Sequence, residues 1–125
     1  MDEMQKKRVL VADDDEVWSR VLSLKLENAG FSVSVAHDGL QALDTLGKEK
    51  FDLMVLDLIM PNATGFDVLT QLRARGDKTP VFVSSSLSQE EDRKRALDLG
   101  ATGFFVKQDA GINSLIATVK KMLDV

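Results

Sequence analysis

Five short apolar runs recur along the chain, and they restrict its fold more than any other feature of the sequence. They are rich in Val, Leu and Phe, and their apolar residues are mostly continuous rather than alternating with polar ones. Such runs are typical of strands that are covered on both faces of a sheet. The five predicted strands occupy residues 9–12, 31–36, 51–56, 81–83 and 103–106.

A segment with helical spacing follows each run, and the five segments cover about residues 17–29, 38–46, 66–76, 88–100 and 112–123. Glycines stand where the first, third and fourth segments end, as is common just after helix C-termini. Asp38 is a suitable N-cap for the second helix, and Ser88 opens a capping-box sequence at the start of the fourth. Because the fourth helix offers few apolar side chains, we expect it to be a mobile element.

Strands that alternate with helices predict an α/β fold with a parallel sheet and right-handed crossovers. The strand order 2-1-3-4-5 is one common doubly wound solution, and it brings the polar strand ends of this chain together. We therefore predict one flavodoxin-like domain, with its core at about residues 7–123 and five helices on the two faces of a five-stranded sheet.

Composition excludes several classes of protein. The chain has no cysteine, which rules out a disulfide framework, a thiolate metal site and a catalytic thiol. Its net charge of −4 and the lack of a basic stripe argue against nucleic-acid binding by this chain alone. No apolar signal segment or membrane span is present, so we expect a cytoplasmic protein without membrane contacts.

Polar side chains stand at the carboxyl ends of the predicted strands. Asp13 and Asp14 follow the first strand and Asp57 the third, while Ser84–Ser86 end the fourth and Lys107 ends the fifth. These ends share one edge of a parallel sheet, where ligands bind. Three carboxylates this close repel one another, and one Mg²⁺ together with the lysine would balance their charge.

A carboxylate at such a site can act as a nucleophile and form an acyl phosphate. The next two acids, Asp15 and Glu16, fit the N-terminus of the first helix better than a metal site. His37 has no second ligand nearby in the sequence, so we expect it on the surface. The choice of the reacting carboxylate stays open at this point.

The whole set of motifs resembles the receiver domain of two-component response regulators, over about residues 7–123. The matching positions are the acidic pair Asp13-Asp14, the loop Asp57-Leu58-Ile59-Met60-Pro61 with Gly65, and then Ser85, Phe104 and Lys107. Each motif alone is weak, but together, at the correct strand ends, they are specific.

The resemblance implies a role for each residue of the pocket. Asp57 would receive a phosphoryl group from a sensor histidine kinase or a phosphotransfer protein. Mg²⁺ (or Mn²⁺) would be held by Asp14, Asp57 and the backbone carbonyl of Ile59, with Asp13 acting through water. The chain would then be a phosphoacceptor with at most self-catalysed phosphorylation and dephosphorylation, rather than an enzyme.

The resemblance also implies a switch. Lys107 would pair with the phosphoryl group, Ser85 would move to hydrogen-bond it, and Phe104 would rotate inward. The face made by the fourth helix, fifth strand and fifth helix would change, and a downstream partner or a second copy would dock there.

Four positions depart from the family pattern. Gln108 replaces the proline that usually follows the lysine, so we predict a trans bond after Lys107 and a rearranged loop. Ile59 and Leu87 are apolar at positions that often tune dephosphorylation, which predicts a long-lived phosphoryl state. Phe104 replaces a common tyrosine and can switch only by packing.

Two alternatives compete with this interpretation. Asp13–Val17 also fits the first motif of haloacid-dehalogenase phosphatases, in which Asp13 would be the nucleophile and Asp15 the acid/base. The second alternative is a pseudo-receiver, a binding module that no longer accepts phosphate, and Gln108 is its only support. No output domain follows residue 123, so we expect either a stand-alone, chemotaxis-type receiver or a piece of a longer regulator.

Overall fold

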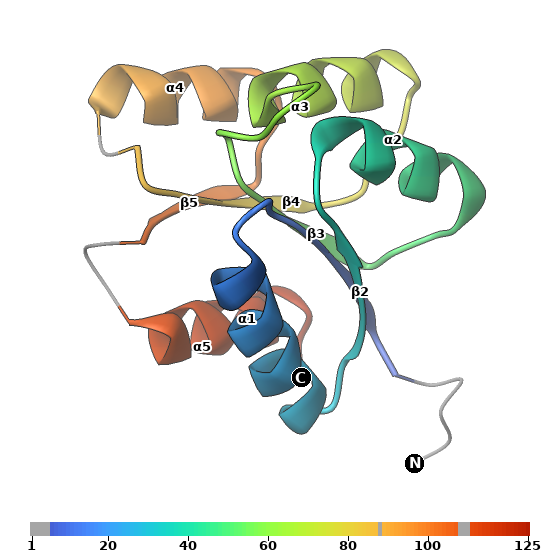
Figure 1. Cartoon of the computed structure of the whole chain (residues 1–125), viewed down its shortest axis with the longest axis vertical. Coiled ribbons are helices and arrows are strands. Elements are labelled where there is room, and N and C mark those ends of the chain that lie inside the picture. Colours follow the sequence, from blue (N-terminus) through green and yellow to red (C-terminus); the bar gives the residue numbers. More distant parts are fainter. Residues whose placement is uncertain (1–5, 88, 108–110) are drawn as a thin grey trace.

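A computed structural model describes residues 6–87, 89–107 and 111–125. Five parallel strands form one sheet in the order β2-β1-β3-β4-β5, as predicted (Figure 1). The strands are β1 (Arg8–Ala12), β2 (Ser32–Ala36), β3 (Leu53–Leu56), β4 (Val81–Ser85) and β5 (Gly103–Val106). The helices are α1 (Glu16–Asn28), α2 (Gly39–Lys48), α3 (Gly65–Ala74), α4 (Glu90–Asp98) and α5 (Ile112–Met122).

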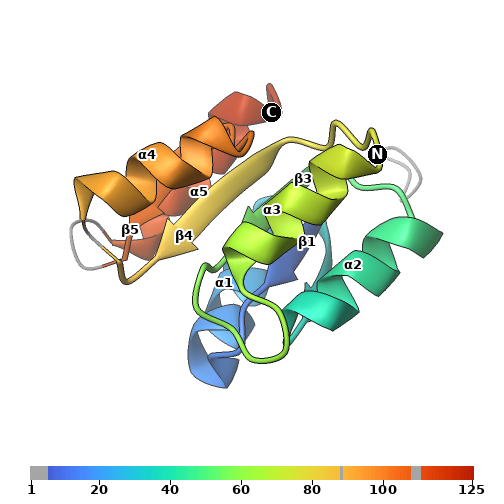
Figure 2. The same cartoon turned by 90° about the horizontal axis from the view of Figure 1, so that it is seen from above.

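The helices lie on both faces of the sheet, which explains why β3 is apolar throughout and β1 is apolar from Val9 to Ala12. Helices α2, α3 and α4 cover one face, and α1 and α5 cover the other (Figures 1 and 2). Along β1, Leu10 and Ala12 belong to the core under α2, α3 and α4, whereas Val9 and Val11 belong to the core under α1 and α5. Because successive side chains point to opposite faces, a central strand between two helical layers, such as β3, buries all of its side chains.

Most of the predicted helix ends are confirmed. Asp15 and Asp38 are the N-caps of α1 and α2, and each carboxylate accepts backbone N–H groups of the first turn. Glycines with positive φ follow α1, α3 and α4, at Gly30, Gly76 and Gly100.

The predicted capping box of α4 is wrong. The N-cap of α4 is Gln89, whose side chain makes no capping hydrogen bond, and Ser88 lies outside the described residues. Ala96 is the one buried residue of this helix, so its burial is as low as expected. Its mobility stays a prediction. No helix of the described chain is long and apolar enough to cross a membrane.

Candidate functional site

The sheet holds the polar strand ends together through its own backbone hydrogen bonds. Strand β3 lies beside β1, and the Asp57 N–H donates to the Ala12 carbonyl at 2.9 Å. On the other side of β1, the Asp13 N–H donates to the Ala36 carbonyl at 3.0 Å. The Lys107 N–H donates to the Ser85 carbonyl at 2.9 Å, one residue beyond β5. The parallel ladder therefore fixes the backbone of the site before any side chain contributes.

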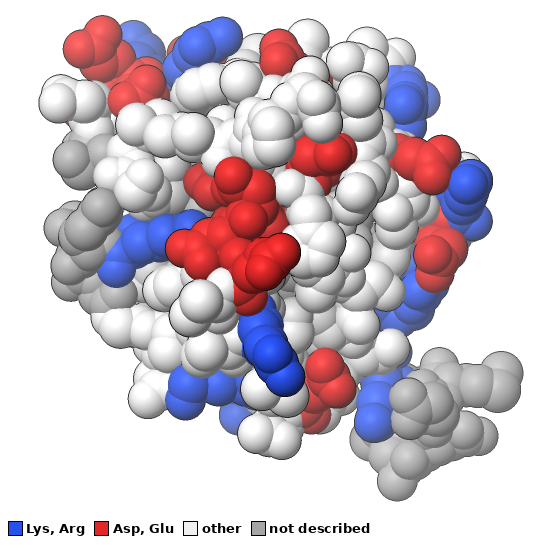
Figure 3. All heavy atoms as spheres, viewed as in Figure 1, with Lys and Arg blue, Asp and Glu red and all other residues white. Residues whose placement is uncertain are grey.

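Three carboxylates converge at this edge, as the sequence predicted. Oxygen atoms of Asp13, Asp14 and Asp57 all lie within 4.8 Å of one another. Asp13 and Asp57 are buried, with 2% and 6% of their surface exposed, whereas Asp14 is exposed. Figure 3 shows acidic side chains gathered in the middle of this face, with basic side chains next to them. Since the oxygen-rich cluster keeps a net negative charge, its donor set fits a hard divalent cation such as Mg²⁺.

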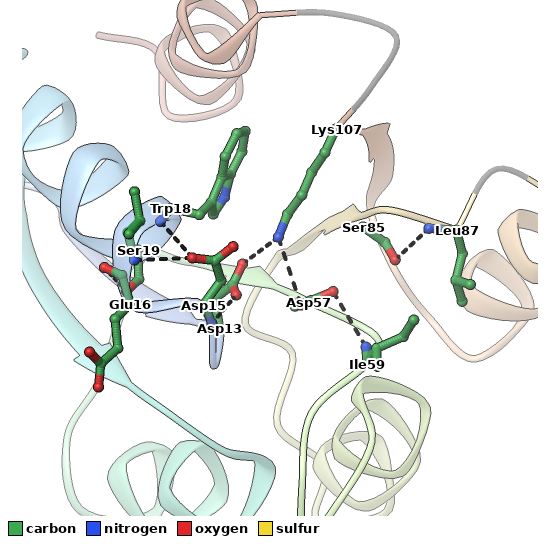
Figure 4. A network of polar contacts seen from close by, with 11 residues as sticks. Asp13, Asp15, Glu16, Trp18, Ser19, Asp57, Ile59, Ser85, Leu87 and Lys107 are labelled. Atoms are coloured by element: carbon green, nitrogen blue, oxygen red, sulfur yellow. Dashed lines mark hydrogen bonds and ion pairs between the residues drawn. The ribbon is translucent and has the colours of Figure 1, made fainter.

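Lys107 reaches into the cluster. Its Nζ atom lies 2.8 Å from Asp13 Oδ2 and 3.8 Å from Asp57 Oδ2, and only 15% of its side chain is exposed (Figure 4). Lys107 is therefore aimed at the carboxylates in spite of the missing proline. The bond between Lys107 and Gln108, predicted to be trans, lies outside the described residues.

Burial perturbs the carboxyl group of Asp57. Desolvation is the largest cause and the negative charge of Asp13 the second, and together they raise its pKa from 3.8 to about 6. The Lys107 ammonium and the Ile59 N–H, which donates to Asp57 Oδ1 at 3.3 Å, act in the opposite direction. At neutral pH Asp57 is therefore mostly ionised, but at a cost in free energy.

The loop after Asp57 folds closely over its own backbone. The Gly65 N–H donates to the Leu58 carbonyl at 2.9 Å, and a Cβ atom at Gly65 would collide with the backbone of Asp57 and Leu58. Met60 is buried in the core, while Ile59 is 53% exposed beside the pocket. The spacing from Asp57 to Met60 and Gly65 thus has a physical reason. The loop needs a buried apolar side chain at Met60 and a residue without a side chain at Gly65.

Ser85 and Phe104 lie at the neighbouring strands, as predicted. The Ser85 hydroxyl is fully buried and accepts the N–H of Leu87 at 3.1 Å. Phe104 is half-buried against the core under α2, α3 and α4. The next residue, Phe105, packs on the other face, edge-to-face with Phe82 at 6.2 Å.

Other acidic and basic positions take structural roles. The Asp15 carboxylate accepts the N–H groups of Val17 and Trp18 at 3.0 Å each, so it caps α1 instead of facing the three acids. This geometry removes the acid/base that the phosphatase alternative requires. His37 is exposed, as expected. The contact between Trp18 and Lys107 was not predicted from the sequence, in which Trp18 follows the acidic pair by about one helical turn.

A doubly wound sheet with an aspartate triad and a lysine at its carboxyl edge defines a phosphoacceptor signalling domain. The chain belongs to the response regulator receiver domain family, whose family model matches residues 9–120. This match confirms the family, the fold and the general function that the motifs predicted, and it excludes the phosphatase alternative. Receiver domains bind Mg²⁺ at an acidic cluster of this kind.

Individual relatives agree with this assignment. The chain is 37% identical over 116 residues to the response regulator MprA of Mycobacterium avium, covering 93% of this chain and 50% of MprA. The receiver domain of the Francisella response regulator 1452 superposes with a TM-score of 0.90 at 32% identity, covering 95% of this chain and 98% of that domain. The chemotaxis response regulator CheY4 of Vibrio cholerae superposes with 0.87 at 29% identity, covering 94% and 99%. The chain spans about half the length of the curated relatives that it matches.

Proposed function

We propose that Asp57 is the phosphoacceptor of this receiver domain. The observation that carries the proposal is the position of its carboxylate, buried beside Asp13 and Lys107 at the edge of the sheet. Asp13 is committed to Lys107 at 2.8 Å and to the Asp15 N–H at 2.9 Å. Asp57 instead has longer contacts, with the Ile59 N–H at 3.3 Å and Lys107 at 3.8 Å, and a weaker interaction with the Leu58 N–H. A carboxylate with fewer strong partners is the better nucleophile.

The donor is the phosphohistidine of a sensor histidine kinase or a phosphotransfer protein. An Asp57 carboxylate oxygen attacks the phosphorus and forms a P–O bond, while the P–N bond breaks and its electron pair stays on the donor imidazole. Asp13, Asp14, Asp57 and the Ile59 carbonyl would hold Mg²⁺, which when bound neutralises charge on the phosphoryl oxygens. Lys107 supplies the second positive charge and needs only a small shift from Asp13 to reach the new phosphoryl group.

Residues on β4 and β5 then respond to the phosphoryl group. The Ser85 hydroxyl turns from Leu87 to donate to a phosphoryl oxygen, which releases space for Phe104 to move from its half-buried position. The surface of α4, β5 and α5 thereby changes and docks a downstream partner or a second copy of the chain. Because α4 buries only Ala96, little packing opposes its displacement. The domain, at about residues 7–123, works as a signalling module and catalyses nothing beyond its own phosphorylation and dephosphorylation.

Intact mass after incubation with Mg²⁺ and acetyl phosphate tests this function. The wild type is expected to gain one phosphoryl group and Asp57→Asn none. Asp13→Asn leaves the nucleophile in place and is expected to slow the gain without abolishing it. A gain that persists in Asp57→Asn but disappears in Asp13→Asn would place the nucleophile on β1. No gain in the wild type, with Mg²⁺ binding intact, would leave a pseudo-receiver.

A further inference from the structure

An aromatic ring lies against the lysine of the site. Lys107 Nζ lies 4.9 Å from the ring centroid of Trp18, a distance typical of a cation–π contact. In Figure 4 the indole and the lysine side chain lie next to each other above the carboxylates. Trp18 comes from the first turn of α1 and packs against the core under α1 and α5. The packing against this core therefore holds the indole ring in place.

Lys107 needs such a support for two reasons. A lysine side chain has several rotatable bonds, and fixing it costs conformational entropy. The residue after it, Gln108, also lacks the ring that fixes the backbone at a proline. The ladder hydrogen bond from the Lys107 N–H to Ser85 fixes only the backbone end of the side chain.

The contacts of the ammonium group differ in how they respond to phosphorylation. Its two carboxylate partners, Asp13 at 2.8 Å and Asp57 at 3.8 Å, belong to the charged cluster that changes when a phosphoryl group arrives. The indole face carries no net charge and takes no part in the acidic cluster. A cation that rests on it can exchange one oxygen for another without losing this contact.

We propose that Trp18 is a positioning residue of the phosphoacceptor site, whose indole face holds the Lys107 ammonium over Asp13 and Asp57. The inference rests on the proposed function, because it concerns the cation that meets the phosphoryl group on Asp57. It adds a residue of α1 to the site and assigns it a role separate from its packing.

The chain contains a single tryptophan, so biosynthetic replacement by fluorinated tryptophans changes position 18 alone. Each added fluorine withdraws electron density from the ring and weakens the cation–π contact, while the shape of the side chain changes little. With mono-, di- and trifluorotryptophan we expect the rate of phosphorylation by acetyl phosphate to fall stepwise, by about three- to tenfold in total. The unfolding midpoint should stay constant across the series. A rate that does not follow the degree of fluorination would overturn the proposal.

Two matched controls separate positioning from packing. Trp18→Phe keeps a weaker aromatic face and should phosphorylate faster than Trp18→Leu, which keeps only bulk. In a Lys107→Met background, fluorination should leave the residual rate unchanged, because the cation is gone. Equal rates for the Phe and Leu variants, or a fluorine effect that survives without Lys107, would contradict a role through the lysine.

Side-chain NMR keeps failure of the inference apart from failure of the proposed function. The indole ring current should shift the Lys107 Hε resonances upfield in the wild type but not in Trp18→Leu. Absence of this shift would refute the contact whether or not Asp57 is phosphorylated. A wild type that shows the shift but gains no phosphoryl group would refute the proposed function, and the positioning role with it.

Discussion

Neutralising Asp57 should stabilise the protein at neutral pH, and the structure gives the size of the gain. The pKa of this carboxyl is raised from 3.8 to about 6 in the folded protein, mainly by burial and then by Asp13. The folded state therefore binds the proton more tightly than the unfolded state does. Ionisation then costs stability as the pH rises from about 4 to about 6, and the full cost persists above this window. A difference of roughly two pKa units corresponds to about 3 kcal/mol.

The substitution Asp57→Asn removes this cost while keeping the shape of the side chain. Its amide oxygen can still accept the Ile59 N–H, and Lys107 keeps its partner Asp13 at 2.8 Å. In urea denaturation at pH 7 with EDTA, we expect the free energy of unfolding to rise by about 2–3 kcal/mol relative to wild type. At pH 4 the two proteins should differ by less than about 1 kcal/mol.

Asp14→Asn is the matched control, because it removes a charge from the same cluster at an exposed position. We expect a gain below about 1 kcal/mol, since surface charges are screened by solvent. An Asp57→Asn gain that is equal at pH 4 and pH 7 would show that the stabilisation does not arise from ionisation. A loss of stability at pH 7 would refute the reasoning altogether.

Three further predictions concern the metal, the loop and the phosphoryl lifetime. Millimolar Mg²⁺ should raise the unfolding free energy of the wild type, and a calorimetric titration should show weaker binding to Asp57→Asn, which lacks one charged ligand. Gly65→Ala should lower the free energy of unfolding in urea by about 1–3 kcal/mol, because its Cβ would collide with the backbone of Asp57. Gly47→Ala lies in helix α2 with free space around it, and it should raise the free energy of unfolding by about 0.5–1 kcal/mol. Because Ile59 and Leu87 cannot orient a water by hydrogen bonding, phosphorylated protein should lose its phosphate slowly, and Ile59→Asn should shorten the lifetime measured by intact mass.

The fold could be predicted from the sequence because the central strands have the residue pattern of strands that are buried on both faces. The run Val9 to Ala12 is apolar at every position, as expected for a strand that is covered on both faces. The strand order was chosen on chemical grounds among the common doubly wound orders, because neighbouring strands β1 and β3 bring Asp13 and Asp57 together. Helix α4 was harder to define, because its single buried residue, Ala96, gives no periodic signal that locates its first turn.

The residues that come together at the site could be predicted from the sequence, but the contacts between their side chains could not. The ladder places Asp13, Asp57 and Lys107 at one edge whatever their side chains do, so their residue types and spacing sufficed. The stronger bond of Lys107 to Asp13, and its contact with Trp18, depend on rotamers and on the packing of α1 against the sheet. Such contacts join residues about ninety positions apart in the chain, and no local pattern encodes them.

The cost of burying Asp57 and its proposed role as phosphoacceptor have the same origin, the excess negative charge of the pocket. Lys107 offsets one of three negative charges, so the pocket keeps an excess that destabilises the folded state. Phosphorylation replaces one carboxylate charge by a group that carries about −1.5 to −2 at neutral pH. The pocket must then offer more positive charge than Lys107 alone provides. Phosphoryl and Mg²⁺ binding are therefore expected to be coupled, each raising the affinity for the other by the same factor.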